Sequence, residues 1–294
     1  MDAVGNTTKA ITKGIAIATA VLAATALFGS FTDAVSAAVR KTGVTPASDN
    51  YAFGFNLAQP NNLVGLIIGA SVVFLFSGLA ISAVGRAAGR VVFEVREQFR
   101  THPGIMDFSE RPDYSRVVDI CTRDSLRELA TPGLLALFAP ILIGFSFGVA
   151  PLAGYLTGAI GAGVLMAVFL ANSGGAWDNA KKMVEDGRHG GKGSEAHAAT
   201  VIGDTVGDPF KDTAGPAINP LIKVMNLVAV LVAPAVVQLS LGDHASWGFR
   251  LLIGVVALAI IVAAVTVSKR RKISIGDAPA SDQTALTPVR SGTS

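Results

Sequence analysis

Long stretches without a charged side chain dominate this sequence. Residues 131–177 form the longest of them, with 47 residues. One helix needs only about 20 apolar residues to cross a bilayer, so this stretch is long enough for two antiparallel spans. We expect the turn between them near Pro151 and Gly154. Four further stretches are each long enough for one span: residues 14–31 and 63–85, the stretch that ends near Gly242, and residues 251–268.

The composition supports a membrane protein made of helices. Hydrophobic residues make up 51% of the chain and charged residues 15%, with a mean hydropathy of +0.52. A soluble domain usually has about a quarter charged residues. We therefore predict an all-α, polytopic membrane helix bundle of about six transmembrane helices within residues 1–272. Residues 273–294 are rich in Ser, Thr, Pro and Ala, which predicts a disordered cytoplasmic tail.

A cleaved secretory signal is the alternative explanation of the first apolar stretch, because residues 34–37 vaguely resemble a cleavage site. The residues before that stretch are not clearly basic, since Asp2 partly offsets Lys9 and Lys13. The stretch is also longer than the about 7–15 apolar residues of a signal peptide. We expect a membrane span instead. The single cysteine, Cys121, excludes a disulfide framework.

The distribution of basic residues predicts the orientation in the cell membrane. Residues 269–272 are all basic and follow the last span directly, so they should stay in the cytoplasm. Six spans then place the N-terminus, residues 86–130 and residues 178–212 on the cytoplasmic side as well. The eight arginines of residues 86–130 lie inside, and few basic residues lie outside, so the positive-inside rule is obeyed.

One polar segment, residues 203–223, carries charged groups at regular intervals just where an apolar span begins. If the segment is helical, Asp204, Asp208 and Asp212 stand at i, i+4 and i+8 and share one face. Neighbouring like charges repel by roughly a few tenths of a kcal/mol per pair, so such a face implies bound cations. Carboxylates without His or Cys point to Mg²⁺. The alternative is a set of solvated charges at a helix end.

Two further features of this segment favour a binding site. Lys211 lies one turn from Asp208 and is the kind of point charge that holds a phosphate oxygen. Helix-weakening residues are frequent, and opened backbone at membrane depth is tolerated only where it lines a cavity or is packed in protein. These residues are Gly207, Pro209, Gly215, Pro216 and Pro220. The pattern therefore indicates Mg²⁺ and a phosphate.

The glycine-rich residues 187–194 superficially resemble a phosphate-binding loop. The Walker pattern fails, because Asp186 occupies the first Gly position and Gly193 follows Lys192 where Ser or Thr is needed. We expect residues 187–203 to form a flexible cytoplasmic loop that covers the site.

Three segments resemble one family. The run Gly-Asp-Thr-Val-Gly-Asp-Pro-Phe-Lys-Asp-Thr-Ala-Gly-Pro-Ala-Ile-Asn-Pro-Leu-Ile-Lys at 203–223 closely resembles the last acidic motif of the membrane-integral, ion-pumping pyrophosphatases. The runs Gly-Gly-Ala-Trp-Asp-Asn-Ala-Lys-Lys at 174–182 and Asp-Ala-Val-Gly-Asn-Thr-Thr-Lys-Ala at 2–10 are also similar to segments of that family. The resemblance covers roughly residues 1–240. The family chain is much longer, and its two earlier acidic motifs are absent here, so we expect the C-terminal portion of a pump.

The resemblance implies a role for each matching residue. Mg²⁺ would be held by Asp178, Asp204 and Asp208, with Asp2 as a further ligand. Pyrophosphate would be held by Lys211 and Lys182. Asp212 would orient and deprotonate the attacking water.

Two lysines would act outside the hydrolytic site. Lys223 is eleven residues past Asp212, about 16 Å deeper on an unbroken helix, and the family uses a lysine here in its ion gate. Its alternative role is to snorkel to an interface. Lys9 stands where potassium-dependent members carry Ala, which implies a potassium-independent pump. Lys9 could instead only help to set topology.

The sequence thus predicts a pyrophosphate-energised proton pump, an H⁺-translocating inorganic diphosphatase that is inactive as this portion alone. Its partners would be pyrophosphate, protons, the lipid bilayer, the remaining N-terminal part of the pump and a second copy, but no nucleic acid. The alternative is a non-enzymatic transporter of Mg²⁺ or another cation. Whether the chain is a truncated gene, a split subunit or a fragment stays open at this point.

Overall fold

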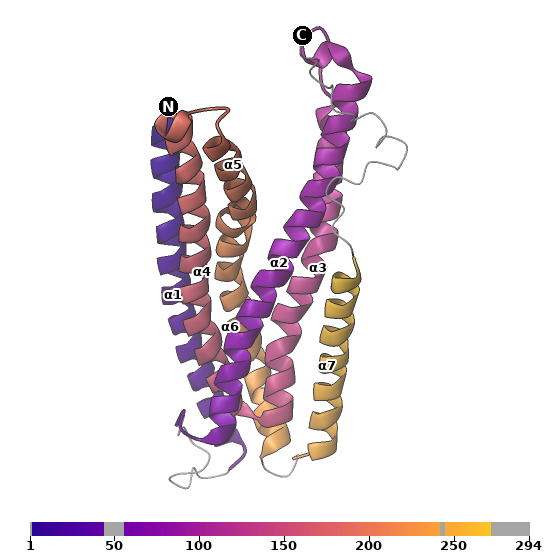
Figure 1. Ribbon diagram of the computed structural model, residues 1–294. Helices are drawn as coiled ribbons and strands as arrows, with labels where there is room; N and C mark the ends of the chain where they lie inside the picture. The colour runs from indigo at the N-terminus through magenta and orange to yellow at the C-terminus, as the bar shows by residue number, and fades with distance from the viewer. Residues whose placement is uncertain (1, 44–55, 242–244, 272–294) are drawn as a thin grey trace, which may run out of the picture. The chain divides into compact units, whose positions relative to one another are not determined.

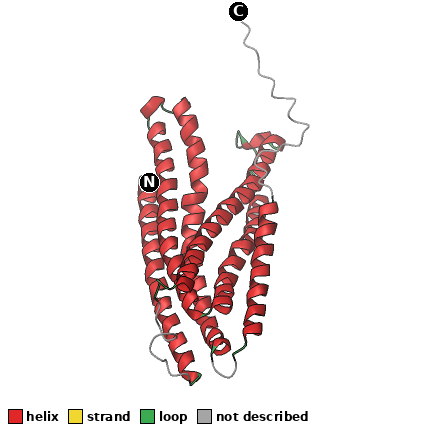
Figure 2. Ribbon diagram, turned by 60° about the horizontal axis from the view of Figure 1, so that its bottom comes forward, coloured by secondary structure: helices red, strands yellow, loops and turns green. Residues whose placement is uncertain are grey.

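The computed structural model describes residues 2–43, 56–241 and 245–271, and the side chains of residues 2–11 and 13 are not among the described features. Every regular element in these ranges is helical, as predicted (Figures 1 and 2). The elements are α1 (Asp2–Lys41), α2 (Pro60–Thr101), η1 (Pro103–Ile105), α3 (Tyr114–Phe147), α4 (Val149–Glu185), η2 (Arg188–Gly190), α5 (Glu195–Asp208), the π-helix η3 (Pro209–Ala214), α6 (Gly215–Ser240) and α7 (Trp247–Arg270).

The predicted number of spans is confirmed. Six helical segments in the described residues are long and apolar enough to cross a membrane, and α5, η3 and α6 form one of them without a break. The predicted tail, residues 273–294, lies outside the described residues.

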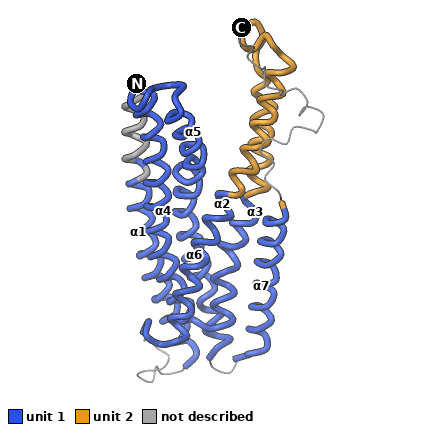
Figure 3. Tube along the Cα trace, viewed as in Figure 1, with its two compact units in different colours: residues 1–81, 129–270 blue, residues 82–128, 271–294 orange. Residues whose placement is uncertain are grey.

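The helices form two compact units, which Figure 3 shows in different colours. Unit 1 consists of residues 1–81 and 129–270, and unit 2 of residues 82–128 and 271–294. Unit 1 contains the hydrophobic core and all the predicted site residues. The two units are described separately below.

The first span is longer than predicted. The charge-free stretch ends at residue 31, but α1 continues to Lys41. Phe31, Val35, Ala38 and Val39 are all buried, at a spacing that keeps one apolar face towards the core. Asp33, the one charged residue between them, is exposed and does not interrupt that face. Residues 44–55 lie outside the described residues.

The turn within the 47-residue stretch also differs from the prediction. Residues 131–177 do form two helical segments, but the chain reverses at Gly148, where φ is 103°. Glycine adopts this conformation without steric penalty. Pro151 lies in the first turn of α4, where proline is tolerated, and Gly154 lies inside the helix. The predicted turn is therefore several residues too late.

Glycines bring α2 and α4 into backbone contact. A Cβ atom added to Gly154 would collide with the carbonyl oxygen of Asn62, and one on Gly158 with that of Leu66. Gly69 meets the backbone of Tyr155 in the same way from the other helix. Small residues at this spacing let membrane helices approach closely. Gly154 and Gly158 therefore serve packing, as their spacing predicts.

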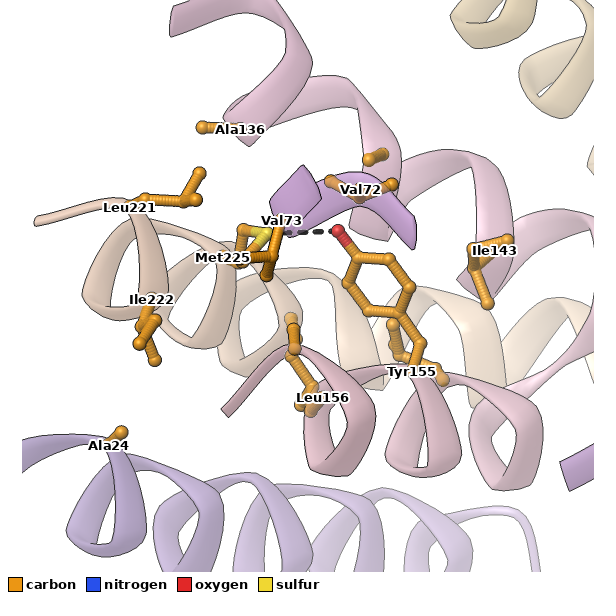
Figure 4. Close-up of a cluster of buried hydrophobic side chains, with 14 of the residues drawn as sticks. Ala24, Val72, Val73, Ala136, Ile143, Tyr155, Leu156, Leu221, Ile222 and Met225 are labelled. Carbon is orange, nitrogen blue, oxygen red and sulfur yellow. Dashed lines mark hydrogen bonds between the residues drawn. The ribbon is translucent and has the colours of Figure 1, made fainter. Parts of the chain in front are cut away.

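The core of unit 1 is built from α1, α2, α3, α4 and α6. Figure 4 shows Tyr155 of α4 pointing into it between side chains of α2, α3 and α6. The Tyr155 hydroxyl donates a hydrogen bond to Met225 Sδ at 2.9 Å, and both residues are fully buried. This packing fixes α4, which contributes to the candidate site, against α6.

Unit 2 contains a hairpin of the end of α2 and the start of α3. The helix α2 continues to Thr101 through a segment with many charged residues. Some of these charged side chains are buried. Arg86 and Glu128 form an ion pair of 2.5 Å with side chains only 6% and 5% exposed, and Arg271 contacts the same carboxylate at 3.4 Å. Arg90 pairs with the buried Asp124.

The predicted loop over residues 187–203 is shorter in the structure. It contains η2 and ends at Ser194, whose hydroxyl accepts a hydrogen bond from the backbone N–H of His197 at 3.1 Å. A serine in this position caps the first turn of a helix, so α5 begins at Glu195.

Candidate functional site

The candidate site lies where α4 meets α5 and η3, within unit 1. The two backbones touch at Gly174 and Gly207: a Cβ atom on Gly174 would lie 2.5 Å from the Gly207 carbonyl oxygen and 2.7 Å from Lys211 Cβ. Trp177 packs against Gly207 from α4, and its ring centroid is 5.8 Å from that of Phe210. This contact places Asp178, one residue after Trp177, beside Lys211.

Lys211 is the centre of the site. Its ammonium nitrogen lies 2.8 Å from Asp178 Oδ2, 3.1 Å from Asp204 Oδ1 and 2.7 Å from Asp208 Oδ1. The Lys211 side chain is only 6% exposed, whereas the Asp208 side chain is 52% exposed. Three of the carboxylates predicted as metal ligands are therefore brought together, around a lysine ammonium.

Two further lysines complete this cluster. Lys182 Nζ lies 3.3 Å from Asp178 Oδ1, one helical turn away, as predicted. Lys181 Nζ lies 2.6 Å from Asp204 Oδ2, which joins α4 to α5. The sequence analysis assigned no role to Lys181. Its signal in the sequence was its place beside Lys182 and three residues after Asp178.

The π-helix η3 replaces the α-helical hydrogen-bond pattern at residues 209–214. Pro209 has no N–H to continue the α-helical pattern, and the N–H of Gly215 donates to the carbonyl of Phe210, five residues earlier. The predicted weakening of the helix is thus confirmed. Asp212 is exposed.

The donor set can be tested against a metal ion. Within the described residues, no group of three or more His, Cys, Asp or Glu side chains is arranged to hold one. The oxygens of Asp178, Asp204 and Asp208 nevertheless converge on one cationic group, the Lys211 ammonium. Hard carboxylate oxygens suit Mg²⁺, but the cluster would have to contract, because Mg²⁺–oxygen distances are about 2.0–2.1 Å. The residues fit the ion by chemistry, and their present spacing fits an ammonium.

Three further predicted residues lie on α6 and α1. Lys223 is half-buried on α6 and makes no hydrogen bond or ion pair with the residues that the structure describes. Asp2 and Lys9 belong to α1, and their side chains lie outside the described features.

Comparisons with known proteins support one family. The profile of the family described as inorganic H⁺ pyrophosphatase matches residues 1–232. The chain is 71% identical over 279 residues to the K⁺-insensitive pyrophosphate-energized proton pump of Streptomyces coelicolor. It is 51% identical over 285 residues to the protein of the same name from Chloroflexus aurantiacus. It is also 46% identical over 258 residues to a putative K⁺-stimulated pyrophosphate-energized sodium pump of Bacteroides thetaiotaomicron.

The chain spans only about a third of the length of these relatives. The alignment covers 94% of this chain and 35% of the Streptomyces coelicolor protein. For Chloroflexus aurantiacus the two shares are 96% and 36%, and for Bacteroides thetaiotaomicron they are 82% and 35%.

Proposed function

The chain belongs to the inorganic H⁺ pyrophosphatase family, and on this premise we propose that it is one part of a pyrophosphate-energised proton pump. The proposal covers the hydrolysis of pyrophosphate, the coupled transfer of protons across the membrane and independence from K⁺. The observation that carries it is the convergence of Asp178, Asp204 and Asp208 on Lys211.

The charges of the cluster favour binding of a metal ion together with an anion. Its three lysines balance its three aspartates, so the cluster is electrically neutral by itself: Lys181, Lys182 and Lys211 against Asp178, Asp204 and Asp208. A divalent cation alone would leave excess positive charge at a partly buried site. Pyrophosphate supplies the matching negative charge. The site is therefore suited to a metal–pyrophosphate complex rather than to either component alone.

The proposed metal ligands are Asp178, Asp204 and Asp208, with Asp2 of α1 as a further ligand. When bound there, Mg²⁺ supplies positive charge that stabilises the negative charge of a transferring phosphoryl group. Asp208 is the most exposed of the three aspartates in contact with Lys211, so it is the one a complex from solution would reach first.

The lysines are proposed to hold the substrate. An ammonium group has three hydrogen-bond donors, and those of Lys211 face three carboxylates. To bind a phosphoryl oxygen, the Lys211 ammonium must give up its contact with at least one of these carboxylates. Lys182 has a longer contact, 3.3 Å from Asp178. Replacing that contact with one to a phosphoryl oxygen therefore costs less free energy.

Asp212 is proposed to orient the attacking water and to accept its proton. Its position in η3 supports a role different from the substrate binding proposed for Lys211. Asp212 follows Lys211 directly but is exposed, whereas Lys211 is buried. The proton set free there would have to cross the membrane past α6. Lys223, eleven residues further along, is proposed to take part in that ion path.

We further propose that the polar ends of α4 and α5 face the cytoplasm, and that the working pump contains the rest of the polypeptide and a second copy. The Bacteroides thetaiotaomicron relative is named a sodium pump, so family membership alone does not fix the transported ion. Proton transport is proposed because the relatives with the higher identities, 71% and 51%, are named proton pumps.

The test is an assay of hydrolysis with two preparations of the purified chain in lipid. The chain alone is expected to release no phosphate from pyrophosphate, because two acidic motifs of the family are absent from it. The same chain assembled with the remaining part of the pump is expected to release phosphate only when Mg²⁺ is present. Robust Mg²⁺-dependent release by the chain alone, or none by the assembly, would refute the proposal.

A further inference from the structure

Two amide side chains of α6 have carbonyl oxygens that are buried without a hydrogen-bond partner. Asn226 is 0% exposed, and its Nδ2 donates to the Ile222 carbonyl of its own helix at 2.9 Å. Asn219 donates from Nδ2 to the Ala16 carbonyl of α1 at 2.8 Å. Neither Oδ1 atom accepts a hydrogen bond from the described residues. A buried acceptor without a donor lowers stability, most of all in a span that water does not reach.

Lys223 lies between these two residues, and within the described residues its ammonium has hydrogen-bond donors but no acceptor. Asn219, Lys223 and Asn226 stand at i, i+4 and i+7, so they form one stripe along α6. The Lys223 ammonium has three donors, none of which is bonded within the described residues. The stripe thus contains unused donors on the lysine and one unused acceptor on each asparagine.

The geometry of a helix brings these groups within reach of one another. Side chains three or four residues apart are neighbours, with Cβ atoms about 5–6 Å apart, and lysine has a flexible four-carbon stem. Helical side chains lean towards the N-terminus, so Asn226 leans towards the turn of Lys223. Its Nδ2 is engaged by the carbonyl of Ile222, which leaves Oδ1 as the free end of the amide.

We propose that Asn226 is a second acceptor for the Lys223 ammonium, which thereby holds its charge at either of two positions along α6, one beside Asn219 and one beside Asn226. This inference rests on the proposed place of Lys223 in the ion path. The two asparagines are roughly 10 Å apart along the helix axis. Movement between them carries a positive charge across part of the apolar layer while each end position offers it an acceptor.

The first arm of the test needs no enzymatic activity. The chain is reconstituted in lipid bilayers with ¹⁵N-labelled lysine and ¹³C-labelled asparagine and studied by solid-state NMR. A dipolar contact is expected between Lys223 Nζ and the side-chain carbonyl carbon of Asn226. The contact should vanish in Asn226→Leu and persist in Asn219→Leu. Contact with Asn219 alone, or with neither asparagine, would overturn the inference.

The second arm measures coupling in the assembled pump. Asn226→Leu is expected to keep the hydrolysis rate within about twofold of the parent and to lower the protons moved per pyrophosphate about tenfold, as for the loss of a hydrogen bond to a charged group. The matched control is Ser77→Ala on α2, which also removes a buried side-chain bond to the backbone of its own helix, at 2.8 Å. It should leave the ratio unchanged.

The outcomes separate this inference from the proposed function. If Asn226→Leu lowers hydrolysis and transport equally, or changes neither, Asn226 has only a structural role and the inference fails. An assembled parent protein that hydrolyses no pyrophosphate would refute the proposed function instead. The NMR contact then still decides whether Asn226 accepts the ammonium.

Discussion

Lys211 shows how single residues connect the fold with the chemistry. Its ammonium is nearly inaccessible to solvent and is held by three carboxylates from two helical segments. A buried charge is costly without such partners, and removal of one partner leaves the others unbalanced. The site should therefore respond strongly to loss of a carboxylate, whereas exposed ion pairs elsewhere should not.

Asp208 is the first test of this contrast. In the assembled pump, Asp208→Asn removes a proposed metal ligand and a contact of Lys211, so hydrolysis should fall by about 100-fold or more. Glu97→Gln is the control, because the Glu97 carboxylate forms an exposed ion pair with Arg100, at 2.8 Å. Such pairs contribute about 0–1 kcal/mol. Equal losses of activity in two well-folded variants would mean that the acidic cluster is structural.

Lys9 is the second residue with a specific expectation. Its ammonium is proposed to supply permanently the positive charge that a bound K⁺ supplies in potassium-dependent relatives. Lys9→Ala should leave the assembled pump folded, lower its hydrolysis rate in K⁺-free buffer and restore much of it when K⁺ is added. The measurement is a K⁺ titration of both forms. A substituted pump that is indifferent to K⁺ would leave Lys9 with a topological role only.

At the scale of elements, the contact between α4 and α5 positions the site. Gly174→Ala would place a Cβ atom against the Gly207 carbonyl and the Lys211 backbone, which a flexible side chain cannot relieve. Forced overpacking costs about 1–3 kcal/mol, so both the thermal midpoint and hydrolysis should fall. Gly175→Ala is the matched control, since nothing lies within 4 Å of its added Cβ atom. If both variants melt like the parent, close approach of these helices does not position the site.

Local pattern predicted the spans and, within the cluster, Asp204, Asp208 and Lys211, whereas Asp178 and Lys182 were predicted from the resemblance to the family. Charge-free length identifies a span, and a spacing of four residues identifies a helix face. The full length of α1 was not predicted. Charged residues such as Arg40 and Lys41 ended the predicted span, although the buried apolar face continues through Val35 and Val39. The turn was misplaced because Pro151 is compatible with a helix start, whereas Gly148 has the left-handed backbone.

Other features of the site depend on tertiary structure and could not be predicted from spacing. The contact of Lys181 with Asp204 requires that α4 and α5 pack in a particular register along their axes. The close approach of Gly174 and Gly207, which are far apart in the sequence, sets this register. The π-helical turn at residues 209–214 is a second such feature. The glycine and proline residues in and around this turn predicted a weakened helix but not which hydrogen-bond pattern would replace it.

For the whole molecule, this chain spans about a third of the length of the relatives that it matches. Its described residues contain the cluster around Lys211, six candidate spans and the α6 stripe. The proposed pump needs partner segments that supply further acidic residues and the other wall of the ion path. Hydrolysis and transport should therefore appear together on assembly.

The most direct measurement is proton movement in sealed vesicles that contain the chain assembled with the remaining part of the pump. Addition of pyrophosphate and Mg²⁺ to the side bearing the polar ends of α4 and α5 should acidify the vesicle interior, in the absence of K⁺, and a protonophore should abolish the gradient. Vesicles with the Asp208→Asn assembly should show no acidification. Pyrophosphate hydrolysis without any proton gradient in tight vesicles, or a gradient that persists in Asp208→Asn, would contradict the account.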